Sequence, residues 1–117
     1  MADTSGIMVH NFSECLLDNM VHFHVMKMKD SLFVWMGKKA ELSSLSVAMC
    51  TKYSSTPAVS NLLGEVSDIT SNTLAQRLAK KLKKQCFISY NLPPENTLLT
   101  LAERRLVEEI DSKPNYF

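Results

Sequence analysis

Two histidines, His22 and His24, are the side chains in this sequence with the clearest capacity for chemistry. They lie in the stretch MVHFHVMKM, residues 20–28, whose alternation of residue types is typical of a β-strand. Alternate side chains of a strand share a face, so both imidazoles would point the same way and could supply two ligands to zinc or iron. One hypothesis is therefore a metal-dependent enzyme that uses His22 and His24.

A metal site of this type also needs a third ligand, and the sequence does not suggest one. Neither the residues around the pair nor the later chain provides an obvious cluster of His, Asp or Cys partners, and His10 lies on another predicted strand. Packed, hydrogen-bonded histidines at an interface are the preferred interpretation. We expect no metal and no cofactor.

Other catalytic patterns are also missing from the sequence. It contains no G-x-S-x-G, no C-x-x-C and no phosphate-binding loop, and the three cysteines Cys15, Cys50 and Cys86 stand singly among apolar neighbours. This cysteine usage predicts reduced core thiols in the cytosol. The acidic residues near the C-terminus are predicted to form a solvated helix face paired with Arg104 and Arg105: Glu103, Glu108, Glu109 and Asp111. We expect a protein that is not an enzyme.

The elements that would position these residues describe one α+β domain over residues 1–117, with residues 1–6 frayed. We predict a mainly antiparallel sheet of about five or six strands and two helices. Pro57 excludes the strand that follows it from the centre of the sheet. The predicted strands are 7–17, 20–28, 31–37, 45–50, 58–63 and 86–92, and the helices run over about 71–84 and 95–112.

The strands 20–28 and 31–37 are close enough in sequence to form a hairpin with a predictable register. If Met28 lies opposite Ser31, one face carries the pairs Met26–Phe33 and His24–Trp35, and the other carries Val25–Val34 and Phe23–Met36. Both faces are then apolar.

Two helices can cover only one of these faces. Their leucine stripes suit that purpose, while the second face would stay exposed as an apolar patch, which usually marks a protein interface. This patch contains His22, His24, Met26, Phe33 and Trp35. We expect a dimer formed sheet to sheet, with helices outside. Which face meets the partner stays open at this point.

The strongest local charge lies on the outer side of the first predicted helix, in Arg77, Lys80, Lys81, Lys83 and Lys84. It is either a solvated face with cations near a helix C-terminus or a docking patch for an acidic partner. The net charge of +1 and the lack of interleaved aromatic residues argue against nucleic acid. Without a signal peptide or an apolar run of membrane length, we expect a cytoplasmic protein with no membrane contact.

Six short segments follow one another in a recognisable order: VHFHVM at 21–26, DSLF at 30–33, AMC at 48–50, LLG at 62–64, LAQRLAKK at 74–81 and SYNL at 89–92. Together they resemble the proteasome assembly chaperone 4 family over residues 9–117. The resemblance implies a non-catalytic cytosolic chaperone whose antiparallel sheet dimerises with proteasome assembly chaperone 3. It also implies that the pair promotes assembly of the alpha-subunit ring of the 20S proteasome, with alpha-type subunit 5 as a particular contact.

From this we expect the five residues of the apolar patch to lie at the dimer face. Arg77, Lys80, Lys81 and Lys84 are the candidates for an alpha-subunit contact. A generic homodimeric adaptor remains the alternative, and homodimerisation of the isolated chain is left open.

Overall fold

The computed structural model of the chain describes residues 7–51, 54–64, 70–93 and 95–117. The predicted fraying of residues 1–6 lies outside the described residues. The elements follow in the order β1 (Met8–Leu16), β2 (Asn19–Lys27), β3 (Ser31–Gly37), β4 (Leu45–Thr51), β5 (Ser54–Leu63), α1 (Thr70–Leu82), β6 (Gln85–Asn91), α2 (Asn96–Ser112) and the 3-10 turn η1 (Pro114–Tyr116).

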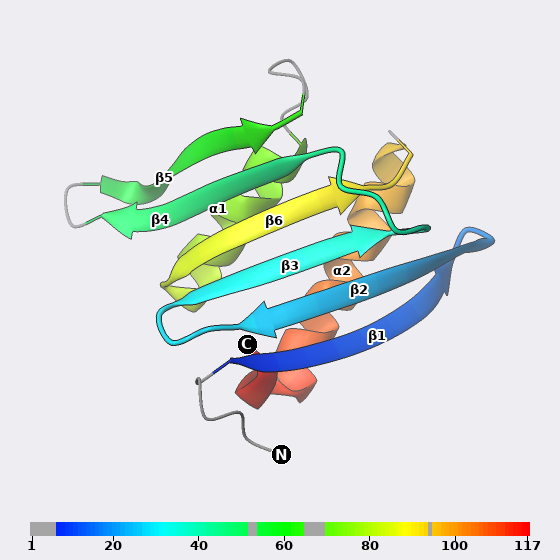
Figure 1. Cartoon of the computed structure of the whole chain (residues 1–117), viewed down its shortest axis with the longest axis horizontal. Helices are drawn as coiled ribbons and strands as arrows, with labels where there is room; N and C mark the ends of the chain where they lie inside the picture. The colour runs from blue at the N-terminus through cyan, green and yellow to red at the C-terminus, as the bar shows by residue number, and fades with distance from the viewer. Residues whose placement is uncertain (1–6, 52–53, 65–69, 94) are drawn as a thin grey trace.

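The strands form one six-stranded sheet in the order β1-β2-β3-β6-β4-β5. β3 and β6 pair in parallel, and the other neighbouring strands pair antiparallel. Both helices lie on the same face of the sheet, behind it in Figure 1. The predicted α+β class and the mainly antiparallel sheet with two helices are therefore confirmed.

The core lies between this face of the sheet and the two helices. Alternate residues of each strand point into it, such as Val21, Phe23 and Val25 of β2, which are at most 1% exposed. The apolar stripe of each helix meets them: Leu74, Ala75, Leu78 and Ala79 from α1, and Leu98, Ala102, Leu106 and Ile110 from α2. None of the described helices is long and apolar enough to cross a membrane.

The predicted hairpin register is confirmed residue by residue. Met26 pairs with Phe33 and His24 pairs with Trp35, while the pairs Val25–Val34 and Phe23–Met36 point to the core. The backbone N–H of Met28 donates to the carbonyl of Ser31 at 2.9 Å and closes the turn. The alternation of apolar residues on both strands, together with the short turn that places Met28 opposite Ser31, fixes this register.

Two element boundaries differ from the prediction by more than one residue, each for a local reason. β5 begins at Ser54 instead of residue 58, because it is an edge strand, and an edge strand tolerates the missing N–H of Pro57. α1 ends at Leu82 instead of residue 84, because Lys83 adopts a left-handed backbone conformation with φ of 57°.

Candidate functional site

One face of the sheet is covered by neither α1 nor α2 (Figure 1). We call it the open face. The strand registers place a set of mostly apolar side chains on it. Its exposed members include Met20 on β2 and Met49 on β4, at 50% and 46% exposure. The strand registers place these residues on it: Val9, Met20, His22, His24, Met26, Phe33, Trp35, Leu45, Val47, Met49 and Phe87.

The five residues predicted for the dimer face all lie on the open face, on the neighbouring strands β2 and β3. His22 is exposed. The others, His24, Met26, Phe33 and Trp35, are half-buried by their neighbours alone. The structure therefore brings the predicted set together as one surface.

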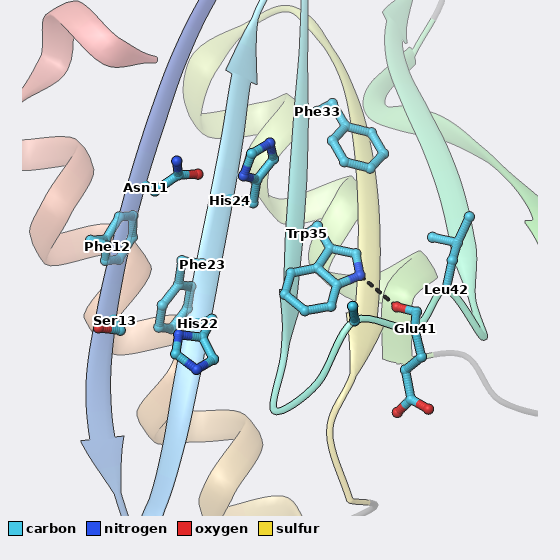
Figure 2. A pocket seen from close by; sticks show the side chains of 11 residues that line it. Asn11, Phe12, Ser13, His22, Phe23, His24, Phe33, Trp35, Glu41 and Leu42 are labelled. Atoms are coloured by element: carbon cyan, nitrogen blue, oxygen red, sulfur yellow. Dashed lines mark hydrogen bonds between the residues drawn. The ribbon is translucent and has the colours of Figure 1, made fainter.

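A hollow of about 820 Å³ lies in the open face between β1 and the loop that joins β3 to β4 (Figure 2). Asn11 and Ser13 line it from β1, His22 and His24 from β2, Phe33 and Trp35 from β3, and Ala40, Glu41 and Leu42 from the loop. The indole Nε1–H of Trp35 donates to the Glu41 carbonyl at 2.7 Å. A second hollow of about 480 Å³ adjoins Phe33 and Phe87. Both hollows are shallow features of one apolar surface, a shape suited to another macromolecule.

Several residues of the open face were not in the predicted set, and some had a usable signal. Phe87 alternates with the core residues Cys86 and Ile88 in β6, so the strand pattern could have placed it on the open face. The contributions of Asn11 and Glu41 depend on the packing of β1 beside β2 and on the path of a loop. A single sequence carries no periodic signal for either.

The two histidines do not belong to a metal-binding cluster in the part of the chain that the structure describes. Among the described residues, no group of three or more His, Cys, Asp and Glu side chains is placed to hold a metal ion. His22 and His24 instead line the apolar hollow beside Trp35.

The cations of α1 are partly paired with the neighbouring helix. Arg77 Nη1 lies 2.6 Å from Glu103 Oε1, and Lys81 Nζ lies 3.4 Å from Asp111 Oδ1, both on α2. Lys84 donates to the backbone carbonyl of Phe117. Lys80 and Lys83 are exposed. The patch is therefore less positive than the sequence suggests.

The prediction of a solvated acidic face is wrong for Glu109, which is only 2% exposed. Its carboxylate accepts hydrogen bonds from Arg105 Nη1 at 2.9 Å and Lys113 Nζ at 3.2 Å, and lies 2.6 Å from His10 Nε2. Burial raises the pKa of this carboxyl, but the hydrogen bonds with His10, Arg105 and Lys113 outweigh it and lower the pKa to about 2. The group is a structural anion that ties β1 to α2. The adjacent Glu108 is exposed, as predicted.

The prediction of three core thiols is correct for one cysteine and wrong for two. Cys86 is buried, and burial raises the pKa of its thiol to about 12. Cys15 and Cys50 are exposed. Cys15 lies on the edge strand β1, and Cys50 lies near the end of β4, where its thiol contacts the Ala79 carbonyl at 3.1 Å. Apolar neighbours in sequence do not bury a residue on an edge strand or near the end of an inner strand.

The fold and the open face define a class of small α+β proteins whose sheet is covered on one side only. A solved chain with a similar fold belongs to the crystal structure of a novel chaperone complex for yeast 20S proteasome assembly. That chain superposes with a TM-score of 0.65 at 13% identity, over 95% of this chain and 98% of that one.

Sequence comparisons identify the family. A sequence model of the proteasome assembly chaperone 4 family matches residues 20–92. Proteasome assembly chaperone 4 of Homo sapiens is 48% identical over 118 residues, covering 100% of this chain and 96% of the relative. Its Mus musculus counterpart is 46% identical over 117 residues, covering 99% and 95%. The chain belongs to the proteasome assembly chaperone 4 family, which confirms the resemblance noted in the sequence.

Proposed function

We propose that this protein is a non-catalytic chaperone that pairs with proteasome assembly chaperone 3 and promotes assembly of the alpha-subunit ring of the 20S proteasome. Alpha-type subunit 5 is the proposed particular contact, and the cytoplasm is the proposed compartment. The family membership supports the process, and the open face supports the mode of pairing.

The uncovered apolar face is the observation that carries this proposal. The molecule is a slab with extents of 37 × 37 × 23 Å, whose broad side is large enough for the roughly 800 Å² per partner of a standard stable interface. Large apolar side chains such as Met20 and Met49 stand half-exposed on it. A second sheet laid on this face would bury them and leave the helices outside, as in aligned sheet packing.

A chaperone of this kind needs no chemical step. It binds a ring intermediate that presents the right alpha-subunit surfaces and thereby stabilises it against wrong pairings. Later subunits that compete for the same surfaces then displace it. The work is done by differences in binding free energy, which fits a site made of apolar and aromatic side chains.

The cations of α1 are the proposed alpha-subunit contact, since this helix lies on the side of the sheet away from the open face (Figure 1). Arg77 and Lys81 already neutralise carboxylates of α2, so the exposed Lys80 is the strongest single candidate. Lys84 contributes from the end of the helix. Substituting Lys80→Glu should weaken capture of alpha subunits while pairing with proteasome assembly chaperone 3 persists.

The decisive experiment is affinity purification of the tagged protein, followed by mass-spectrometric identification of the bound chains. The wild type is compared with Trp35→Asp, which places a charge on the open face, and with Thr97→Asp, which places the same charge on the exposed surface of α2. Circular dichroism is used to check that each variant is folded. We expect wild type and Thr97→Asp to retain chaperone 3 and alpha subunits, and a folded Trp35→Asp to lose chaperone 3.

Two outcomes would contradict the proposal in different ways. Absence of proteasome subunits and of chaperone 3 from the wild-type sample would leave a generic homodimeric adaptor as the better description. Normal pairing by Trp35→Asp would retain the function but exclude the open face as the interface.

A further inference from the structure

We propose that the hollow lined by Trp35 is a preformed receptor for an apolar side chain that projects from the facing sheet of the partner chain. Gly37 and the loop of residues 38–44 hold the Trp35 indole in place within it. This inference rests on the proposed function, because it assigns a role to one part of the proposed interface. It commits to a protein side chain as the occupant.

The first observation is a seat for the indole. Trp35 and Gly37 lie two residues apart on β3, and the benzo ring of Trp35 lies over Gly37. A Cβ added at Gly37 would lie 2.8 Å from Cζ2 and 2.9 Å from Cη2 of Trp35. Real Cβ atoms do not approach other atoms so closely, so any side chain at this position would displace the indole. Glycine is needed here for space.

The second observation is that the loop is fixed at more than one point. Besides the bond between Trp35 Nε1 and the Glu41 carbonyl, Asn91 Oδ1 accepts from the backbone N–H of Ser43 at 2.7 Å and from its hydroxyl at 2.9 Å. Ser44 Oγ donates to the Tyr90 carbonyl at 2.7 Å. The loop is therefore tied to β6 as well as to the indole, and it forms a firm side of the hollow.

The third observation is the profile of the surface. The hollow lies between tall side chains, Phe33, Trp35 and Leu42, and shorter ones on β1, Asn11 and Ser13 (Figure 2). Side chains of two sheets packed face to face interdigitate across about 10 Å. A depression in one sheet is then filled by a projecting side chain of the other. Its lining is mostly apolar and aromatic, which favours an aromatic or branched aliphatic occupant.

The energetic argument concerns preorganisation. A tryptophan that must be ordered on binding loses part of its interaction free energy, whereas one already held in its bound position does not. Buried aromatic anchors that fill or form pockets dominate the affinity of many interfaces. Gly37 and Glu41 therefore act as positioning residues, and Trp35 supplies the contact.

The test uses a double-mutant cycle with purified proteasome assembly chaperone 3 as the probe. In the wild-type background, Gly37→Ala should raise the dissociation constant by about tenfold or more. In a Trp35→Phe background the same substitution should raise the dissociation constant by less than about twofold. A phenyl ring lacks the Cζ2 and Cη2 atoms that clash with the added Cβ. Trp35 is the single tryptophan of the chain, so a changed emission maximum of isolated Gly37→Ala reports the displaced indole.

A second variant tests the hollow itself without touching the seat. Ser13→Trp fills the hollow from β1 and should weaken binding of chaperone 3 by about tenfold, whereas the matched Thr97→Trp on α2 should leave it within about twofold. Both variants should keep the wild-type unfolding temperature within a few degrees.

The failures of the two proposals are distinguishable. Suppose that wild type binds chaperone 3. If Gly37→Ala then lowers the affinity equally in both backgrounds, or if Ser13→Trp binds as tightly as wild type, the receptor proposal is wrong and the proposed pairing stands. If wild type does not bind chaperone 3 at all, both proposals fall together.

Discussion

His10 on β1 and Glu109 on α2 are 99 residues apart in sequence, yet His10 Nε2 lies 2.6 Å from Glu109 Oε2. The contact is enclosed on several sides. The ring of Tyr116 stacks on His10 at 4.3 Å between centroids. Arg105 donates from Nε to Glu14 Oε1 of β1 and from Nη1 to Glu109 Oε1, each at 2.9 Å. Edge strands otherwise have one free side, so this cluster holds β1 against the helical layer.

Removal of the central carboxylate should be costly. In Glu109→Ala the charges of Arg105 and Lys113 lose a buried partner, and we expect the free energy of unfolding to fall by about 3 kcal/mol. Urea denaturation measures the loss. Glu108→Ala, one residue earlier and exposed, should stay within about 0.5 kcal/mol of wild type. Equal losses in the two variants would show that the buried cluster has no special role.

The same carboxylate should make stability depend on acidity in a defined range. The pKa of Glu109 in the folded protein is about 2, against 4.5 as its ordinary value, so the unfolded chain takes up the proton first as the pH falls. The stabilisation is complete above about pH 4.5 and disappears as the pH approaches 2, with a total on the order of 3 kcal/mol. Urea midpoints at pH 5, 4 and 3 should decline less in Glu109→Gln, and parallel declines would refute the assignment.

The three thiols should differ in reactivity. Cys15 and Cys50 are exposed and should react with a thiol reagent in the native protein, while Cys86 should react only after denaturant is added. Its raised pKa, about 12, keeps Cys86 as the unreactive neutral thiol. Absorbance of the released thiolate counts the groups, and Cys15→Ser should lower the native count by one. Rapid native labelling of Cys86 would contradict its burial.

Small residues where α1 packs on β4 should be sensitive to added volume. Ala48 is 1% exposed, so Ala48→Leu should lower the free energy of unfolding by about 1–3 kcal/mol through overpacking. The next residue, Met49, points to the open face, and Met49→Leu should change stability by less than about 0.5 kcal/mol in the isolated chain. A reversed order would mean that the faces of β4 have been assigned wrongly.

The hairpin and the division of the sheet into a covered and an open face were predictable, because both follow from a period of two. Once Val25 and Phe23 point to one side, His24 and Met26 must point to the other. The length of two helices then limits cover to one side. These are local rules, so one sequence is enough to apply them.

The burial of Glu109 and the path of the loop through Glu41 were not predictable in the same way. Glu109 lies among acidic and basic residues in a pattern typical of a solvated helix face, yet it is buried and its carboxylate contacts His10 of β1. The parallel pairing of β3 with β6 likewise joins residues far apart in the chain. Contacts of this kind leave no periodic trace in a sequence.

The position of β6 between β3 and β4 has a consequence for how the chain folds. The hairpins of β1–β3 and of β4–β5 can each form from neighbouring residues, but no hydrogen-bonded ladder joins them until β6 is inserted and pairs with both. Closing these long loops costs entropy before the contacts repay it, so we expect β6 docking to limit the folding rate. Until that step the inner edges of β3 and β4 are unpaired, so we expect the newly made chaperone to be prone to aggregation itself.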